Sequence, residues 1–328
     1  MKESSASITR RHLLRSASFA LGGCAVAGAL PSVLSTKLFA AQAPAANDRI
    51  AQMRAAGATA KLATTKLAGN IYSVTGSGGN MAVLDGPDGK LLIDSSFSTT
   101  APQLKAALAA ISANPLKLLV NTHWHFDHTD GNQAVHNEGA MILAQENTRK
   151  RMSTPQYMAI FDMHVPASTA EALPQITFAD EQQIYFDGEH LHLAHYAPAH
   201  TDTDIFIHFT QSNVIHTGDI WFNGFYPLID YSTGGNISGM VTAAERTLTI
   251  ADGKTIIIPG HGPVGDKAAL QGYHDMLATV RDRVAKLKDS GKSSQETVAA
   301  KPTADLDAKW GHGLFTGDKF TALVYQAL

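Results

Sequence analysis

The most informative segment of the chain is Asn121-Thr-His-Trp-His-Phe-Asp-His-Thr-Asp-Gly-Asn132. It follows Leu116-Lys-Leu-Leu-Val120, a short apolar run that predicts a buried strand. The polar residues begin where this strand ends, and α/β proteins usually place their chemistry on such loops. The loop carries four side chains of the type that binds metals: His123, His125, Asp127 and His128.

Two metal ions are expected from the spacing of these residues. Side chains two residues apart in a loop can converge on one ion, as we expect of His123 and His125. Asp127 and His128 follow slightly later and are expected to serve a second ion. Imidazole and carboxylate groups suit zinc, iron and other divalent metals. A His-rich polar turn is the alternative, but four such side chains directly after a buried strand favour a metal site.

Three further residues complete the predicted site, each at the end of a strand-like run. They are His200 in Pro198-Ala-His-Thr-Asp-Thr-Asp204, Asp219 in Ile215-His-Thr-Gly-Asp219, and His261 in Ile256-Ile-Ile-Pro-Gly-His-Gly262. Glycine or proline beside each one fits a backbone that bends tightly around a ligand. Together they supply a third histidine for one metal, a third ligand for the other, and a carboxylate to bridge them. His190 and His192 also have ligand-like spacing, but they alternate with leucines and predict a solvated face.

In order and spacing, these seven residues resemble the metallo-β-lactamase superfamily over residues 70–287. The resemblance implies an α/β protein with a four-layer αβ/βα sandwich, in which two mixed β-sheets lie face to face with helices outside. It also implies a dinuclear site at one edge of the sheets. Carried over, the first metal is held by His123, His125 and His200, the second by Asp127, His128 and His261, and Asp219 bridges them.

Two differences in the ligand set narrow the choice of branch within the superfamily. One branch of β-lactamases uses a cysteine ligand, and the only cysteine of this chain is Cys24, near its start. Another branch has only His and Asp ligands but lacks the bridging acid that Asp219 supplies. Asp219 is closer to the glyoxalase II and lactonase branches, or to exported family members with unassigned substrates. The nuclease branch is not indicated, because no long inserted domain separates Asp219 from His261.

The activity that the resemblance implies is hydrolysis by two Zn²⁺ ions. A hydroxide bridging the metals would attack the carbonyl of a β-lactam, lactone, ester or thioester. Asp127 is the candidate catalytic residue, which orients the nucleophile and shuttles its proton. One alternative is iron or a mixed metal pair in an oxidoreductase or sulfur dioxygenase, because His and Asp ligands suit iron too. The other is a non-catalytic periplasmic metal-binding partner of a redox system.

Aromatic residues near the ligands predict an apolar wall for a small-molecule substrate. The residues expected there are Trp124, Phe126, Trp221, Phe225 and Tyr226. Core packing is the alternative for Trp221 and its neighbour Phe222. Residues 153–175 hold three prolines and several apolar side chains. They predict either an irregular lid over the site, with His164 near the pocket, or a crossover loop.

The first forty residues predict an export signal. Thr9-Arg-Arg-His-Leu-Leu-Arg15 resembles a twin-arginine signal, and a weakly apolar run over residues 17–34 follows it. We therefore expect a signal peptide at 1–40 and a periplasmic or secreted catalytic domain at 41–328, with a helical extension over 288–328. A lipid anchor at Cys24 and an amphipathic N-terminal helix are the alternatives.

Composition limits the partners of the chain. It has 328 residues, 44% of them hydrophobic, and a mean hydropathy of −0.07, which fits a soluble protein with a sizeable core. Residues 41–328 hold 21 Lys and Arg against 28 Asp and Glu. This acidic balance leaves no basic stripe for phosphates and argues against nucleic acid. No stable membrane span is expected, and the sequence sets no oligomeric state.

The remaining pattern predicts two similar halves. In the first, Gly86-Pro-Asp-Gly89 joins two apolar runs and predicts a β-hairpin. In the second, strand-like runs over 176–220 precede more helices. The expected helices cover residues 47–60, 101–111, 239–250, 266–289 and 316–328.

Overall fold

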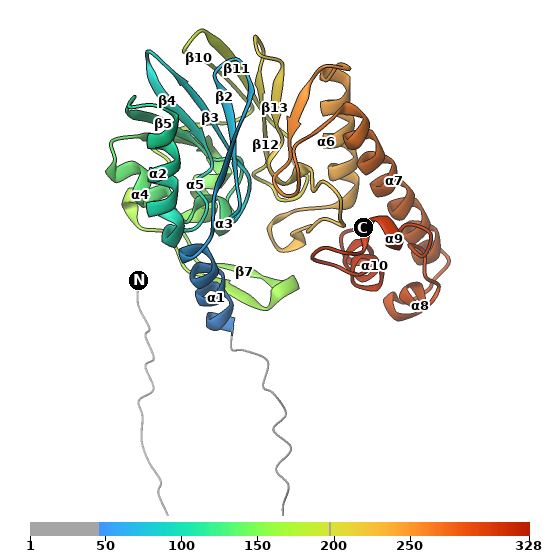
Figure 1. The fold of residues 1–328 in the computed structure, drawn as a ribbon. Helices are drawn as coiled ribbons and strands as arrows, with labels where there is room; N and C mark the ends of the chain where they lie inside the picture. The colour runs from blue at the N-terminus through green and yellow to red at the C-terminus, as the bar shows by residue number, and fades with distance from the viewer. Residues whose placement is uncertain (1–45, 197) are drawn as a thin grey trace, which may run out of the picture. The chain divides into compact units, whose positions relative to one another are not determined.

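Two mixed β-sheets face each other, and helices cover their outer sides (Figure 1). This computed structural model describes residues 46–196 and 198–328. The arrangement confirms the predicted αβ/βα sandwich. The predicted export signal and Cys24 lie outside the described residues.

The first sheet has seven strands in the order β1-β2-β3-β4-β5-β6-β9. Their bounds are β1 (Ala63–Ala68), β2 (Ile71–Thr75), β3 (Met81–Gly86), β4 (Gly89–Ile93), β5 (Leu116–Val120), β6 (Met141–Gln145) and β9 (Ile176–Phe178). Strands β1 to β4 are antiparallel, and β4, β5, β6 and β9 are parallel. Strand β4 is buried on both faces, which explains its continuous apolar run Leu91-Leu92-Ile93.

The second sheet has six strands in the order β10-β11-β12-β13-β14-β15. Their bounds are β10 (Glu181–Phe186), β11 (Glu189–His195), β12 (Ile205–Phe209), β13 (Val214–His216), β14 (Ile256–Ile258) and β15 (Gly265–Asp266). Only β13 and β14 pair in parallel. Strands β11, β13 and β14 therefore run in the same direction, and their carboxyl ends meet at one edge.

Ten helices are present in the described residues. They are α1 (Ala46–Ala58), α2 (Ala101–Ile111), α3 (Phe126–Thr129), α4 (Asn132–Asn137), α5 (Glu146–Met152), α6 (Ile237–Ile250), α7 (Lys267–Asp289), α8 (Ser294–Ala299), α9 (Asp307–Trp310) and α10 (Gly317–Gln326). None of these helices is long and apolar enough to cross a membrane. The five expected helices are all found within a few residues of their predicted bounds.

The segment 153–175 contains regular structure that was not expected. It contains a two-stranded hairpin of β7 (Gln156–Met158) and β8 (Met163–Val165), which pair antiparallel. Strand β1, which extends the first sheet beyond β2, was not expected either. Strands of three residues are too short to show an alternating pattern, which is why the hairpin was not evident in the sequence.

The two sheets are joined by an apolar layer of buried side chains. Ile71, Leu84 and Ile93 of the first sheet pack with Leu193 and Ile207 of the second. A separate cluster lies beneath α2, and another lies beneath α6 and α7. Because the inner layer involves both sheets, it fixes the relative position of the loops at their edges.

We expect the substitution Ile207→Ala to lower the free energy of unfolding by about 2–5 kcal/mol, because it opens a cavity in this layer. Urea unfolding followed by circular dichroism measures the change. Thr177→Ala, at an exposed position on β9, should change it by less than about 0.5 kcal/mol. Equal effects of the two substitutions would contradict the assigned core.

Candidate metal centre

Loops at the carboxyl ends of four strands bring the seven predicted ligands together. The loop after β5 supplies His123 and His125, and α3 directly follows with Asp127 and His128. The loops after β11, β13 and β14 supply the other three: His200, Asp219 and His261. Strands thus deliver all seven side chains to one place from segments that are far apart in sequence.

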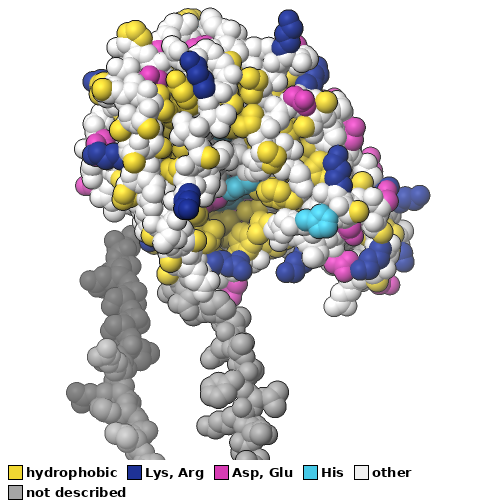
Figure 2. Space-filling model, viewed as in Figure 1, with side chains coloured by type: hydrophobic (Ala, Val, Ile, Leu, Met, Phe, Trp, Pro, Cys, Tyr) yellow, Lys and Arg dark blue, Asp and Glu magenta, His cyan; other side chains and the backbone are white. Residues whose placement is uncertain are grey.

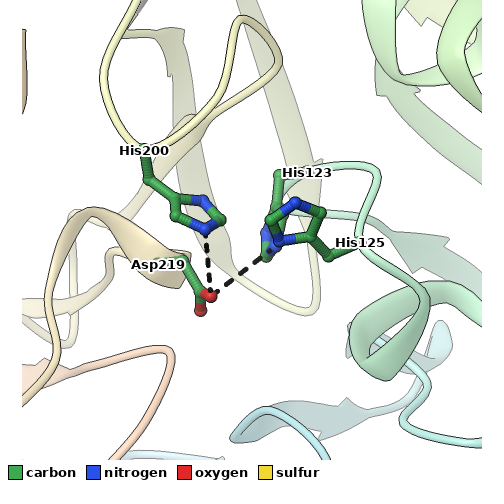
Figure 3. Close-up of side chains that lie close together, drawn as sticks. All are labelled: His123, His125, His200 and Asp219. Atoms are coloured by element: carbon green, nitrogen blue, oxygen red, sulfur yellow. Dashed lines mark ion pairs between the residues drawn. The ribbon is translucent and has the colours of Figure 1, made fainter. Parts of the chain in front are cut away.

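The first group of side chains consists of three histidines and an aspartate (Figure 3). In His123, His125, His200 and Asp219, one potential ligand atom per residue lies within 4.8 Å of the others. His123 Nε2 is 3.8 Å and His200 Nε2 is 3.6 Å from Asp219 Oδ2. All four residues are buried.

The second group consists of Asp127, His128 and His261, and Asp219 of the first group lies close to both of its histidines. His261 Nε2 is 3.3 Å from Asp127 Oδ2 and 3.5 Å from Asp219 Oδ2. His128 Nε2 is 3.1 Å from Asp219 Oδ1. One carboxylate therefore faces both groups, as a bridging ligand must.

The buried polar atoms of this cluster fit bound metal ions. His123 Nε2 and His200 Nε2 have no hydrogen-bond partner among the described residues, although both are inaccessible to solvent. Leaving such atoms unpaired costs free energy, so they usually have a ligand. Imidazole nitrogens and carboxylate oxygens grouped in this way are a donor set for divalent metals.

Three further carboxylates hold the ring positions of the histidines. Asp94 Oδ2 lies 2.7 Å from His128 Nδ1, and Asp230 Oδ2 lies 3.1 Å from His125 Nε2. Asp204 Oδ1 lies 3.3 Å from His200 Nδ1. Each carboxylate engages one ring nitrogen and leaves the other for a metal, an arrangement common around metal sites. His125 thus presents Nδ1, whereas His128 and His200 present Nε2.

Sequence reasoning did not identify these three carboxylates as site residues. Asp94 ends a strand, and Asp204 lies in the same polar run as His200, so both had a positional signal. Asp230 has no such positional signal, because it approaches His125 only through the fold, from 105 residues away in the chain.

The charges of the cluster shift the pKa values of its members in opposite directions. Burial raises the pKa of Asp127, but His128 and His261 outweigh it and lower the pKa to about 2. Burial lowers the pKa of His261, but Asp219 and Asp127 outweigh it and raise the pKa to about 9. Burial, followed by the charge of His128, holds the pKa of His123 well below its ordinary value. Asp127 is therefore ionised at neutral pH, as is Asp219, because burial raises the pKa of Asp219 but the neighbouring histidines outweigh it and hold the pKa well below its ordinary value.

Two glycines make room for ligands. A Cβ added to Gly79 would lie 2.0 Å from His128 Cε1, and one added to Gly260 would lie 2.0 Å from Asp219 Oδ1. No real Cβ tolerates such a distance, so a side chain at either position must displace a ligand.

We expect Gly79→Ala to weaken metal binding by at least about tenfold, because the new methyl group displaces the His128 ring. Competition with a chromophoric chelator measures the affinity of the refolded, metal-loaded protein. Gly253→Ala is the matched control, because its Cβ meets nothing within 4 Å. Unchanged affinity in Gly79→Ala would exclude His128 as a ligand.

A cavity of about 1040 Å³ lies beside the cluster. Asp127, Asp219 and His261 line it, together with the predicted pocket residues Phe126 and Phe225. Residues 158–163, at the turn of the β7–β8 hairpin, also line it. The segment predicted as a lid or crossover therefore forms one wall. His164 instead packs on Tyr157, with ring centroids 4.8 Å apart.

Three predicted pocket residues do not line this cavity within the described part of the chain. Trp124 is buried, donates its Nε1–H to Thr233 Oγ1 (3.2 Å) and borders a separate cavity of about 270 Å³. Trp221 is fully buried in the core. Tyr226 is also buried, and its hydroxyl donates to Asp307 Oδ1 (2.9 Å) and not toward the ligands. The Trp124 ring packs edge-on against His125, with centroids 4.7 Å apart, on the side away from the large cavity.

Comparison with known families identifies the chain. Residues 74–266 match the family model of the metallo-beta-lactamase superfamily, so the chain belongs to that superfamily. This confirms the family that the ligand pattern indicated. Comparison with curated protein sequences gives no match.

Solved structures share the fold at low sequence identity. A metallo-beta-lactamase from Pontibacter korlensis is 19% identical, with a TM-score of 0.54 over 66% of this chain and 99% of that one. The stereoselective inverting sec-alkylsulfatase Pisa1 from Pseudomonas sp. is 19% identical, with a TM-score of 0.64 over 81% of this chain and 50% of that one. The DIM-1 metallo-beta-lactamase is 20% identical, with a TM-score of 0.51 over 67% and 98%. This chain spans about half the length of the sec-alkylsulfatase.

Proposed function

We propose that the protein is a dinuclear metal-dependent hydrolase of a small molecule. The observation that carries this proposal is the position of Asp219, whose carboxylate faces both ligand groups at the wall of a large cavity. A site of this kind places two metals next to a substrate space, as hydrolytic two-metal sites require.

The residues have separate roles in this proposal. His123, His125 and His200 would hold one ion, Asp127, His128 and His261 the other, and Asp219 would contact both. Divalent ions in these positions supply Lewis acidity and make water a good nucleophile at neutral pH.

We assign to Asp127 the role of accepting the proton of the attacking water. Its carboxylate is ionised at neutral pH and lines the cavity, so it can accept a hydrogen bond from the attacking water and orient it. Asp94, Asp204 and Asp230 do not reach the cavity; they keep the imidazole rings in place.

Zinc is the metal that we propose, in both positions. All seven candidate ligands are His or Asp, which are common ligands of zinc in proteins. The same donors also suit iron. The candidate substrates are β-lactams, lactones, esters and thioesters. Sulfate esters join them, because a structural neighbour is named as an alkylsulfatase.

Metal analysis paired with turnover tests the proposal. We expect about two zinc ions per chain and hydrolysis of at least one substrate in a panel of a chromogenic cephalosporin, lactones, aryl esters and aryl sulfates. Two metals with no turnover on the whole panel would favour the iron oxidoreductase or the non-catalytic partner instead.

We expect Asp127→Ala and His128→Ala each to lose about one metal per chain and about a thousandfold in kcat/KM, since metal catalysis supplies several kcal/mol. The matched control is His192→Ala, from the other His-x-His pair. The side chain of His192 is partly exposed on β11 and lies near Glu181. Full activity with one metal would show that a single ion is enough.

We also propose export by the twin-arginine route, on the strength of Arg10 and Arg11 in the N-terminal sequence. Replacing both with lysine should leave the protein in the cytoplasm, as measured by fractionation and immunoblotting. Unchanged export of this variant would contradict the proposed route.

A further inference from the structure

The cavity beside the cluster is larger than metal chemistry alone requires. At about 1040 Å³ it is at the upper end of the range of about 300–1,000 Å³ typical of small-molecule sites. Figure 2 shows a hollow with a histidine at its floor and hydrophobic side chains around it. The body of a large ligand can fit next to the reacting bond.

Apolar side chains from four parts of the chain form most of the walls. The contributing segments are α1, the β7–β8 hairpin, the loop after Asp219 and the C-terminal residues 314–326. Three of the wall residues are methionines: Met53, Met158 and Met163. Methionine side chains are unbranched and adapt to irregular or flexible ligands.

The charged side chains that line the cavity, apart from those of the candidate ligands, are all exposed. Arg49, Asp162 and Lys319 line it with exposed side chains. Arg49 lies over the ring of Phe161 at 4.8 Å, and Asp162 accepts a hydrogen bond from Tyr157 (2.8 Å). Charge is therefore available at the solvent side, whereas the interior near Phe126 and Phe222 favours apolar groups.

The outer walls come from segments beyond the part of the chain that matches the family. The family model covers residues 74–266, whereas α1 and residues 314–326 lie before and after it. Helix α1 is anchored to the metal-binding loop, because Arg54 Nε donates to Asp130 Oδ2 (2.9 Å). Phe315 stacks on Phe161 of the hairpin, with centroids 6.4 Å apart. These contacts within the chain therefore hold both outer walls in place.

We propose that the substrate is an amphiphile, with its hydrolysable ester at the metal cluster and a long alkyl or acyl chain along the cavity. The reaction in this statement rests on the proposed function, whereas the binding of the chain does not. The occupant that best matches the walls is a fatty acyl or alkyl ester, because its length fills the space and its methylenes match the methionines and phenylalanines.

The first test measures binding without turnover. The metal-loaded full chain is titrated calorimetrically with butyrate, octanoate, dodecanoate and hexadecanoate below their micelle-forming concentrations. We expect each added methylene to tighten binding by about two- to fourfold until the cavity is full, as burial of apolar groups predicts. Affinity that does not depend on chain length would overturn the proposal.

Two variants link this dependence to the cavity. Ala322→Trp should fill the space beside α10 and weaken dodecanoate binding by at least about tenfold while leaving butyrate unchanged. Ala109→Trp, on the exposed side of α2, is the matched control. Leu314→Gln is a second test that does not threaten folding, because Leu314 lines the cavity but is 49% exposed. Unchanged dodecanoate affinity in both cavity variants would also overturn the proposal.

Turnover separates this inference from the proposed function. With nitrophenyl esters from acetate to dodecanoate, we expect kcat/KM to rise with chain length in the parent protein and to level off early in Ala322→Trp. Chain-dependent binding without turnover of these esters or of any substrate in the earlier panel would support the amphiphile and contradict the hydrolase. Hydrolysis that is equal for all chain lengths would support the hydrolase and contradict the amphiphile.

Discussion

The structure depends on one buried carboxylate. Asp219 is 2% exposed, and the Nε2 atoms of His123, His128, His200 and His261 lie 3.1–3.8 Å from its oxygens. An ionised carboxylate in such a place is costly unless positive charge surrounds it. Burial lowers the pKa of His128, but Asp219, Asp94 and Asp127 outweigh it and raise it well above its ordinary value. Among the protein groups alone, histidine charge balances Asp219; divalent ions can supply the same balance.

The polar groups around the cluster connect the two sheets as well as the ligands. Asp94 accepts hydrogen bonds from Thr122 N (2.8 Å) and Thr122 Oγ1 (2.6 Å), so the end of β4 is fixed to the loop that carries His123 and His125. His216 Nε2 donates to Asn80 O (3.1 Å), and its Nδ1 accepts from Gly218 N (3.1 Å). Burial lowers the pKa of His216 to about 4, so it is neutral and can make both bonds. The loop that carries Asp219 is thereby tied to the first sheet.

The sequence indicated the family and the sandwich, and it indicated that the seven candidate ligands would gather at one edge, because they lie after strand-like runs. It did not indicate which way an aromatic side chain points. Trp124 lies between His123 and His125 in the sequence, but its ring packs on His125 and its Nε1–H donates to Thr233 Oγ1, so it does not line the large cavity. The partner of His125 was also out of reach, since Asp230 is 105 residues away in the chain. Local pattern predicts where a loop begins, whereas side-chain direction depends on the packing of distant segments.

Tyr226 joins the loop that begins at Asp219 to the C-terminal segment that walls the cavity. Its ring stacks on Phe320 of α10 with centroids 4.5 Å apart, its hydroxyl bonds to Asp307, and its amide donates to Trp310 O (2.9 Å). The loop that begins at Asp219 is thus the surface on which the C-terminal segment docks. Because this contact lies outside the ligand set, residues in α10 can change without moving a ligand. The fold can therefore keep the geometry of the ligand cluster while the C-terminal wall of the cavity varies.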